Sequence, residues 1–279
     1  MIIKETTFNE VKELIDLHIK SLTFPFDSYL EDLMINSDFY LFINEDINIG
    51  YAAVDKKMLN FFFIKKEYFN LASTLLENFI NDNSIEKVHI LSQDSFLNRL
   101  IIEWNWEKTL EGCFFIDSKN TKSTQNDPNW SFRVAIESDM KKIKEISGDF
   151  FDEPSGGFDD VIQRIKAKTM FVLENGSDTL GYGVIEKSQL ARKVVSIGMF
   201  VNPSFRKMGA ATIILKNLKI WAYDNDLEPV AGCWYYNTLS RKSLEAAGMI
   251  IATIGYEALL KGKDKLPLRT GNPPGELVN

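Results

Sequence analysis

The residues best suited to chemistry form a loop between an apolar strand and a helix. Residues 194–201 have the pattern of an apolar strand, and beyond a proline turn the chain reads Arg206-x-x-Gly209-x-Ala211. The helix that follows would begin with unpaired backbone N–H groups and the positive end of its dipole, both directed at the loop. Gly209 lacks the Cβ that would block close approach, and Arg206 adds positive charge. The pattern therefore predicts a phosphate-binding loop that suits a diphosphate.

The elements that must position this loop follow from the hydrophobic periodicity of the second half of the chain. The expected order is strand, two helices, three antiparallel strands, helix, strand, helix and strand. The strands are expected at 132–136, 169–173, 180–186, 194–201, 230–235 and 249–260, and the helices at 137–150, around 161–165, at 211–222 and at 238–247. This order predicts an α+β fold, an α/β sandwich around a mixed sheet.

The first half shows a similar order of helical and strand patterns, which predicts a degenerate internal repeat. An alignment of Ile64 with Val201 places Phe69 opposite Arg206, so the arginine of the loop is absent from the first copy. An unrelated α/β domain is the alternative. The polar residues 121–130 have no periodicity and predict a linker. The expected domains are therefore 1–120 and 131–263, followed by a tail at 264–279.

Composition excludes several classes of protein. The chain has 279 residues, 45% of them hydrophobic, and a net charge of −7 that lies mainly in the acidic first 120 residues. Nucleic acid is a poor partner for such a charge. No apolar run approaches the roughly 20 residues of a membrane span, and the N-terminus does not resemble an export signal, so a cytoplasmic protein is expected. Two cysteines and two histidines without zinc spacing predict no metal site.

A second motif lies downstream of the predicted phosphate-binding loop. About 30 residues after the loop, another strand leads into Asn237-x-x-Ser240 and then Gly248-Met249. Together with Arg206-x-x-Gly209-x-Ala211, this combination resembles the GNAT superfamily of N-acetyltransferases. The whole chain resembles a tandem GNAT protein, with two acyl-CoA N-acyltransferase-like domains, whose N-terminal copy has degenerated. The resemblance implies acetyl-CoA as the cofactor of the second domain alone.

The resemblance also implies which residues hold the cofactor. The strand before the loop would pair its backbone with the pantetheine arm, the loop would bind the diphosphate, and the second motif would contact the cofactor nearby. The expected residues are Met199, Phe200 and Val201 on the strand, Arg206, Lys207, Met208, Gly209, Ala210 and Ala211 in the loop, and Asn237 and Ser240. For Asn237 the alternative is that it only caps the following helix.

The position where several members of the family carry the catalytic base is occupied by an apolar residue in this chain. Several members carry a carboxylate 11 residues before the first basic residue of the loop, and Val195 stands there in this chain. If strands 180–186 and 194–201 form a hairpin whose paired residue numbers sum to about 381, Glu186 lies opposite Val195 and on the same face. Glu186 is therefore the predicted base, and an exposed structural glutamate is the alternative.

The general acid shows a similar departure. The family's tyrosine, seven positions after the asparagine, corresponds to Leu244 here. Alternation along the strand that ends near Tyr235 would direct one phenol toward the cleft, which makes Tyr236 the predicted acid. Aromatic packing is the alternative.

The acceptor is expected to be a small-molecule or peptide amine. Residues 149–160 combine acidic and aromatic side chains, a composition that suits a cationic amine. The leading hypothesis is an acetyl-CoA-dependent N-acetyltransferase that uses direct transfer in a ternary complex. A non-catalytic acyl-CoA-binding or sensor protein is the alternative, and a third interpretation has the first half shape the acceptor site. Polyamines, aminoglycosides, amino acids and protein N-termini all stay open, as does the oligomeric state.

Overall fold

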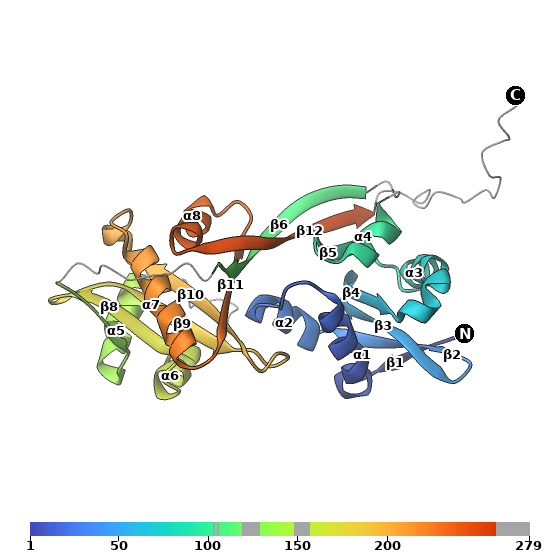
Figure 1. Ribbon diagram of the computed structural model, residues 1–279, viewed down its shortest axis with the longest axis horizontal. Helices are drawn as coiled ribbons and strands as arrows, with labels where there is room; N and C mark the ends of the chain where they lie inside the picture. The colour runs from blue at the N-terminus through green and yellow to red at the C-terminus, as the bar shows by residue number, and fades with distance from the viewer. Residues whose placement is uncertain (103, 105, 119–128, 148–156, 261–279) are drawn as a thin grey trace, which may run out of the picture. The chain divides into compact units, whose positions relative to one another are not determined.

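The computed structural model divides into two compact units, each built from segments that are separated in the sequence. Residues 1–102, 104, 106–118, 129–147 and 157–260 are described, the last range with backbone alone for 157–160 and 260 (Figure 1). Of the described residues, the first unit comprises those in 1–15, 36–110 and 256–260, and the second those in 16–35 and 111–255. Because residues 119–128 lie outside the described residues, the linker predicted at 121–130 stays a prediction.

The first unit is built on a sheet with the strand order β1-β2-β3-β4-β5-β12. Its elements are β1 (Ile2–Thr6), α1 (Phe8–Ser21), β2 (Asp38–Asn44), β3 (Ile47–Asp55), β4 (Met58–Ile64), α3 (Phe69–Asp82), β5 (Lys87–Leu91), α4 (Ser95–Ile101), β6 (Trp106–Asp117) and β12 (Met249–Leu260). Three of these, α1, β6 and β12, continue into the second unit. Strand β1 was not predicted. It is an edge strand with four exposed residues, paired antiparallel with β2.

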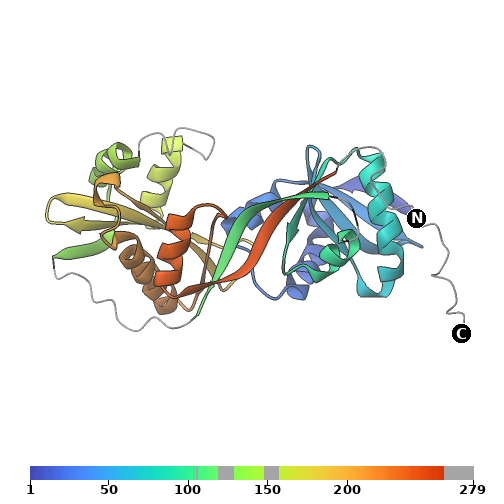
Figure 2. The ribbon, with the colours of Figure 1, turned by 90° about the horizontal axis from the view of Figure 1, so that it is seen from above.

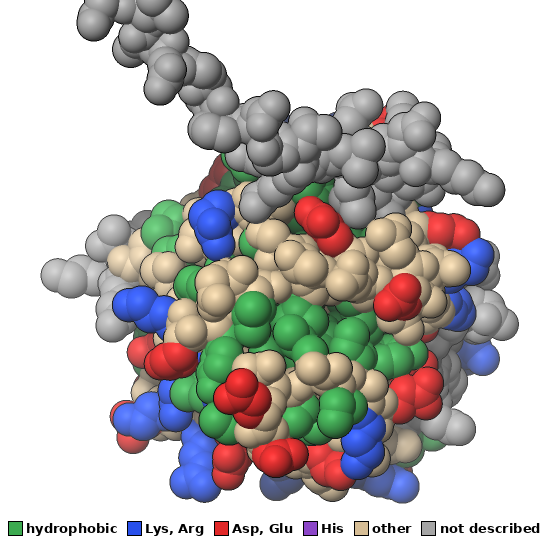
Figure 3. Space-filling model, turned by 90° about the vertical axis from the view of Figure 1, so that its right-hand side faces the viewer, with side chains coloured by type: hydrophobic (Ala, Val, Ile, Leu, Met, Phe, Trp, Pro, Cys, Tyr) green, Lys and Arg blue, Asp and Glu red, His purple; other side chains and the backbone are tan. Residues whose placement is uncertain are grey.

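The core of the first unit is rich in aromatic side chains. Phe42, Phe62 and Phe79 are fully buried and join β2 and β4 to α3, and the rings of Phe42 and Phe79 meet edge to face at 5.6 Å. Such pairs add to the free energy gained from apolar burial. One face of this unit also presents hydrophobic side chains to solvent, with acidic and basic side chains around them (Figure 3).

The second unit has a sheet with the strand order β6-β11-β10-β9-β8-β7. Its further elements are α2 (Ser28–Ile35), β7 (Trp130–Val134), α5 (Met140–Ser147), α6 (Gly157–Lys166), β8 (Met170–Asn175), β9 (Asp178–Lys187), β10 (Val194–Val201), α7 (Ala210–Asp224), β11 (Glu228–Trp234) and α8 (Thr238–Ala246). Helices α5 and α6 cover one face of the sheet, and α7 and α8 cover the other (Figures 1 and 2). The predicted mixed-sheet sandwich is confirmed.

Helix α7 packs closely on the sheet at Gly183 of β9. Its buried positions include Ile214, Leu215 and Leu218, which recur at helical spacing. A Cβ on Gly183 of β9 would lie 2.8 Å from Ile214 Cγ2 and 2.9 Å from Leu218 Cδ1, so only glycine permits this approach. The N-terminus of α7 is thereby fixed at the end of β10, where the predicted phosphate loop begins.

Strands β10 and β11 run parallel but stay paired for only a short distance. The register joins residues 194–196 to residues 228–230 and ends at Ser196 and Val230. On its other side β10 pairs with β9 from Val195 to Val201. The two parallel strands therefore separate beyond Ser196, which leaves one edge of residues 197–201 without a strand partner in the described part of the chain.

The first unit repeats this order but lacks the loop. In the second unit a 3-10 turn at Pro203–Phe205 is followed by the four residues Arg206–Gly209 before α7 begins. In the first unit the equivalent turn at Lys66–Tyr68 runs directly into α3. The alignment of Phe69 with Arg206 was therefore wrong, because α3 begins at Phe69 and the first copy lacks the four residues that form the loop in the second.

Candidate functional site

The loop before α7 has the backbone geometry of an anion cradle. Gly209 is the N-cap of α7 and has a left-handed φ of 90°, and Lys207 has a φ of 67°. A Cβ built on Gly209 would meet no atom within 4 Å, so it would project into open space at the helix N-terminus. The first backbone N–H groups of α7 have no intrahelical acceptor and carry the positive end of the helix dipole. This donor-lined space fits a phosphate group.

Asn202 fixes the start of the loop. Its side-chain oxygen accepts the N–H of Ser204 at 3.1 Å, and its side-chain nitrogen donates to the Thr179 carbonyl, also at 3.1 Å. The guanidinium of Arg206 lies 5.9 Å from the centre of the Phe200 ring, at the contact distance of a cation–π pair. The basic side chain is thus held against an aromatic ring of β10.

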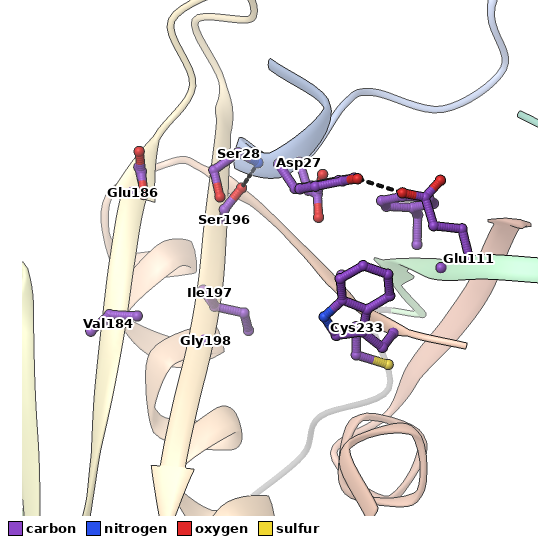
Figure 4. Close-up of a pocket in the computed structure, with 14 residues that line it drawn as sticks. Asp27, Ser28, Glu111, Val184, Glu186, Ser196, Ile197, Gly198 and Cys233 are labelled. Atoms are coloured by element: carbon purple, nitrogen blue, oxygen red, sulfur yellow. Dashed lines mark hydrogen bonds between the residues drawn. The ribbon is translucent and has the colours of Figure 1, made fainter. Parts of the chain in front are cut away.

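A cavity of about 330 Å³ opens where β10 and β11 separate (Figure 4). All the residues that line it belong to the second unit and come from β6, β9, β10, β11 and the start of α2. Three of them carry carboxylates: Asp27, Glu111 and Glu186. Tyr29, Phe114 and Trp234 add aromatic surface. Carboxylates beside aromatic rings suit an organic cation.

Asp27 is the most buried of these carboxylates, with 5% of its surface exposed. Its Oδ1 accepts the N–H of Leu30 at 3.0 Å, which caps α2. Its Oδ2 lies against β11, since a Cβ on Gly232 would be only 2.1 Å away. Burial, assisted by the nearby charge of Glu31, raises the pKa of Asp27 to about 6. Asp27 can therefore exchange a proton near neutral pH.

Glu186 lines the same cavity, but the register predicted for it was wrong by one residue. Glu186 pairs with Ser196, and Val195 pairs with Lys187. Glu186 and Ser196 therefore share the cavity face, while Val195 is fully buried among the side chains packed against α7. The Glu186 carboxylate forms an ion pair with Arg164 of α6 at 3.1 Å.

Both halves of the chain match models of one enzyme family. The model described as an acetyltransferase (GNAT) domain matches residues 7–118, and the model of the acetyltransferase (GNAT) family matches residues 140–249. The chain contains two GNAT domains. No curated protein sequence matches it.

Solved structures of GNAT proteins have the same fold at low sequence identity. An acetyltransferase of the GNAT family from Colwellia psychrerythraea superposes with a TM-score of 0.84 at 15% identity, over 94% of this chain and 100% of that one. A GCN5-related N-acetyltransferase from Sphaerobacter thermophilus gives 0.65 at 13% identity, over 92% and 94%. A tandem GNAT protein from the clavulanic acid biosynthesis pathway gives 0.59 at 8% identity, over 94% and 99%.

The residues predicted to hold the cofactor in the second GNAT domain occupy two neighbouring elements. Those on β10 lie along its free edge and those of the loop surround the N-terminus of α7. Asn237 caps α8, because its side-chain oxygen accepts the N–H of Ser240 at 3.1 Å. Capping leaves a cofactor contact possible, and the binding roles stay predictions.

Tyr236 does not line the cavity. Strand β11 ends at Trp234, one residue before the predicted end, so the alternation argument does not reach the two tyrosines. Tyr236 is 73% exposed and its ring meets that of Tyr235 edge to face at 5.1 Å. Trp234 takes the place in the cavity wall instead. The acid role of Tyr236 stays a prediction.

Three further residues show why the site has no acid, base or thiolate at their positions. Leu244 is buried in the core beneath α8, as Val195 is beneath α7, so neither position can present an acid or base. Cys233 lines the cavity, but burial raises the pKa of its thiol to about 11, which keeps it protonated near neutral pH. It therefore supplies no thiolate for a covalent route.

Sequence reasoning missed Asp27, Glu111 and Ser196 as residues of the site. A signal for Asp27 was available in the sequence, because it immediately precedes the helical pattern of residues 28–35, but an aspartate in that place indicates only a helix cap. The acidic and aromatic residues 149–156 lie outside the described residues, as do the side chains of 157–160. Among described residues, no group of His, Cys, Asp and Glu could hold a metal ion, and no helix is long and apolar enough to cross a membrane.

Proposed function

We propose that the second GNAT domain is an acetyl-CoA-dependent N-acetyltransferase whose acceptor is a small-molecule or peptide amine. One observation carries the proposal. Strand β10 contributes Ser196 and Gly198 to the carboxylate-lined cavity and then leads into the donor-lined loop at Gly209. A carboxylate-lined cavity and a donor-lined loop thus follow one another along one strand with a free edge, an arrangement that would suit a cationic acceptor and an anionic acyl carrier.

The residues that would hold coenzyme A fit that group chemically. Backbone N–H groups from Arg206 to Ala211 suit the diphosphate, and the free backbone edge of residues 199–201 suits the amide groups of the pantetheine arm. The cofactor would supply an acetyl group activated as a thioester. The first GNAT domain has no equivalent loop in its described residues, so we expect one binding site per chain.

The protein's own groups would bind the amine and remove its proton. An ammonium ion placed among the cavity carboxylates gains charge-assisted hydrogen bonds and contact with the Trp234 ring. Glu186 remains a candidate base and Tyr236 a candidate acid, although only Glu186 lines the cavity.

A non-catalytic acyl-CoA sensor is the second candidate. It is favoured by the burial of Val195 and Leu244, where related enzymes place acid and base groups. The sensor would bind acetyl-CoA without any amine-dependent release of thiol.

One assay distinguishes the N-acetyltransferase from the non-catalytic sensor. The purified protein is incubated with acetyl-CoA and a panel of diamines, aminoglycosides, amino-acid amides and short peptides, and free thiol is measured with a chromogenic disulfide. The enzyme releases thiol only when a suitable amine is present. Measurable binding of acetyl-CoA by calorimetry with no release for any amine contradicts the enzyme and supports the sensor.

A further inference from the structure

The start of helix α2 reaches the point where β10 and β11 separate. The N–H of Ser28 donates to Oγ of Ser196 on β10 at 2.7 Å. The neighbouring residue, Asp27, places its Oδ2 over Gly232 on β11. Two consecutive residues at the start of α2 are therefore fixed on the two strands where they diverge, at the last paired residue of β10, Ser196, and at Gly232, two residues beyond the last paired residue of β11, Val230. Figure 4 shows Asp27 beside Ser28 and Ser196 in the cavity wall.

A second attachment holds α2 in this position. Glu31 accepts hydrogen bonds from the Ser188 hydroxyl and from the N–H of Gln189 at 2.9 Å, both in the turn between β9 and β10. Helix α2 is thus pinned at the turn as well as at Ser196. Because α2 is attached at both places, the Asp27 carboxylate at its start has a fixed position, which a catalytic group requires.

Glycine at position 232 is what admits the carboxylate. Any larger residue would place its Cβ 2.1 Å from Asp27 Oδ2, closer than two such atoms can approach. The space for the Asp27 carboxylate therefore depends on a glycine of β11 that is more than 200 residues away in the sequence.

We propose that Asp27 is the catalytic base that removes a proton from the acceptor amine. The proposal rests on the proposed function. The ammonium nitrogen gives one proton to Asp27, which passes it to solvent. The nitrogen then forms a bond to the acetyl carbon as the carbon–sulfur bond breaks, and the departing sulfur takes a second proton from the same nitrogen. One amide, one thiol and one released proton result.

The ionisable groups around Asp27 favour this role. Glu31 and Asp32 lie on its own helix, Cys233 faces it from β11, and Glu111 and Glu186 line the same cavity from β6 and β9. Burial, with the charges of Glu31 and Asp32, raises the pKa of Asp27 to about 6. The carboxylate is then mostly ionised at pH 7 yet more basic than an ordinary aspartate.

Asp27 suits the task better than Glu186 because of their partners. Arg164 holds the Glu186 carboxylate in an ion pair at 3.1 Å, and a proton arriving there must displace that cation. Asp27 instead accepts the N–H of Leu30 through Oδ1 at 3.0 Å, while its Oδ2 lies against β11. Glu186 would then orient the amine without taking its proton.

The test compares Asp27→Asn with Asp94→Asn. Asparagine caps helices as well as aspartate does, so α2 should keep its N-cap. Asp94 is a matched control, because it is a buried aspartate that caps α4 through Leu97 at 2.9 Å in the first unit. Thermal unfolding of each variant checks the fold. Should Asp27→Asn fail to fold, Asp27→Ser, which also caps, takes its place.

The readouts are the pH profile of amine-dependent thiol release, calorimetric binding of acetyl-CoA, and a carbon-13 NMR titration of the aspartate carboxyls. We expect Asp27→Asn to lower kcat by about 100-fold or more and to abolish a rise of kcat/KM near pH 6. Acetyl-CoA affinity should not change, and Asp94→Asn should match wild type. In the wild-type titration, adding the best amine substrate should shift the resonance that is missing from Asp27→Asn.

The outcomes separate the two claims. Active wild type with an equally active Asp27→Asn variant, or with an unchanged pH profile, overturns the role of Asp27 and leaves the acetyltransferase intact. Wild type that binds acetyl-CoA but acetylates no amine in the panel overturns the proposed function and the role of Asp27 together.

Discussion

The backbone N–H of Ser28 donates a hydrogen bond to the hydroxyl of Ser196 at 2.7 Å, across 168 positions of sequence. This contact attaches the start of α2 to the last residue of β10 that still pairs with β11. A segment from the N-terminal half of the chain thereby becomes part of the second unit and of its cavity.

Replacing Ser196 with alanine should weaken this attachment. The N–H of Ser28 loses its acceptor in a partly buried position, so the free energy of unfolding should fall by about 1–2 kcal/mol. Urea denaturation monitored by circular dichroism measures the change. Ser243→Ala is the control, since its hydroxyl bonds only to Leu239 within the exposed part of α8, and it should cost little. Equal effects for the two variants would show that the attachment contributes nothing.

The phosphate loop can be tested at Gly209. Alanine there must adopt a φ of 90° and projects a Cβ into the donor-lined space, so the dissociation constant for acetyl-CoA should rise by about tenfold or more. Gly176→Ala is matched for strain, because Gly176 has a φ of 58° and open space around it in the turn between β8 and β9. Calorimetry should show wild-type affinity for that control. Weakened binding in both variants would assign the effect to general strain.

The buried ion pair between Lys219 and Asp117 should dominate the stability of the second unit. Its atoms are 2.6 Å apart with side-chain exposures of 0% and 6%, and Lys219 also donates to the Ala247 carbonyl at 2.8 Å. Lys219→Met leaves the Asp117 carboxylate buried without its cation and should cost about 3–5 kcal/mol of unfolding free energy. The exposed pair of Lys57 and Glu86 is the control, and Lys57→Met should cost at most about 1 kcal/mol. A small effect of Lys219→Met would mean that water reaches Asp117.

Stability should also depend on pH through Asp27. Its pKa is about 6 in the folded protein, against 3.8 for the ordinary side chain, so between about pH 4 and 6 the folded state retains a proton that the unfolded chain has lost. The free energy of unfolding therefore falls as pH rises through this window, by up to about 3 kcal/mol. Asp27→Asn removes this dependence, and the difference between variant and wild type across the window measures it. A constant difference would place the pKa of Asp27 in its ordinary range.

Much of the fold could be predicted from local patterns. Strand β10 and strand β12 have the predicted bounds, because their apolar residues run without interruption between turn signals. Strand β1 escaped prediction because it is an edge strand whose side chains are mostly exposed, so burial left no pattern in its sequence. The hairpin register of Glu186 was missed by one residue, since the length of an irregular turn cannot be fixed from composition.

The site was less accessible to prediction than the fold. The loop at Gly209 could be identified because its residues are contiguous and its glycine is needed for a left-handed φ. The cavity could not, because Asp27, Glu111 and Ser196 come from separate elements and meet only through tertiary packing. No periodicity in one segment predicts which residue of another it will contact.

The central claim is that the second GNAT domain transfers acetyl groups from acetyl-CoA to an amine. Mass spectrometry of an amine panel incubated with acetyl-CoA and the full chain tests it most directly, with Gly209→Ala in parallel. The account predicts at least one amine that gains a single acetyl group with wild type, and much less of that product with Gly209→Ala. Acetyl-CoA binding without any acetylated amine, or the same yield from both proteins, would contradict it.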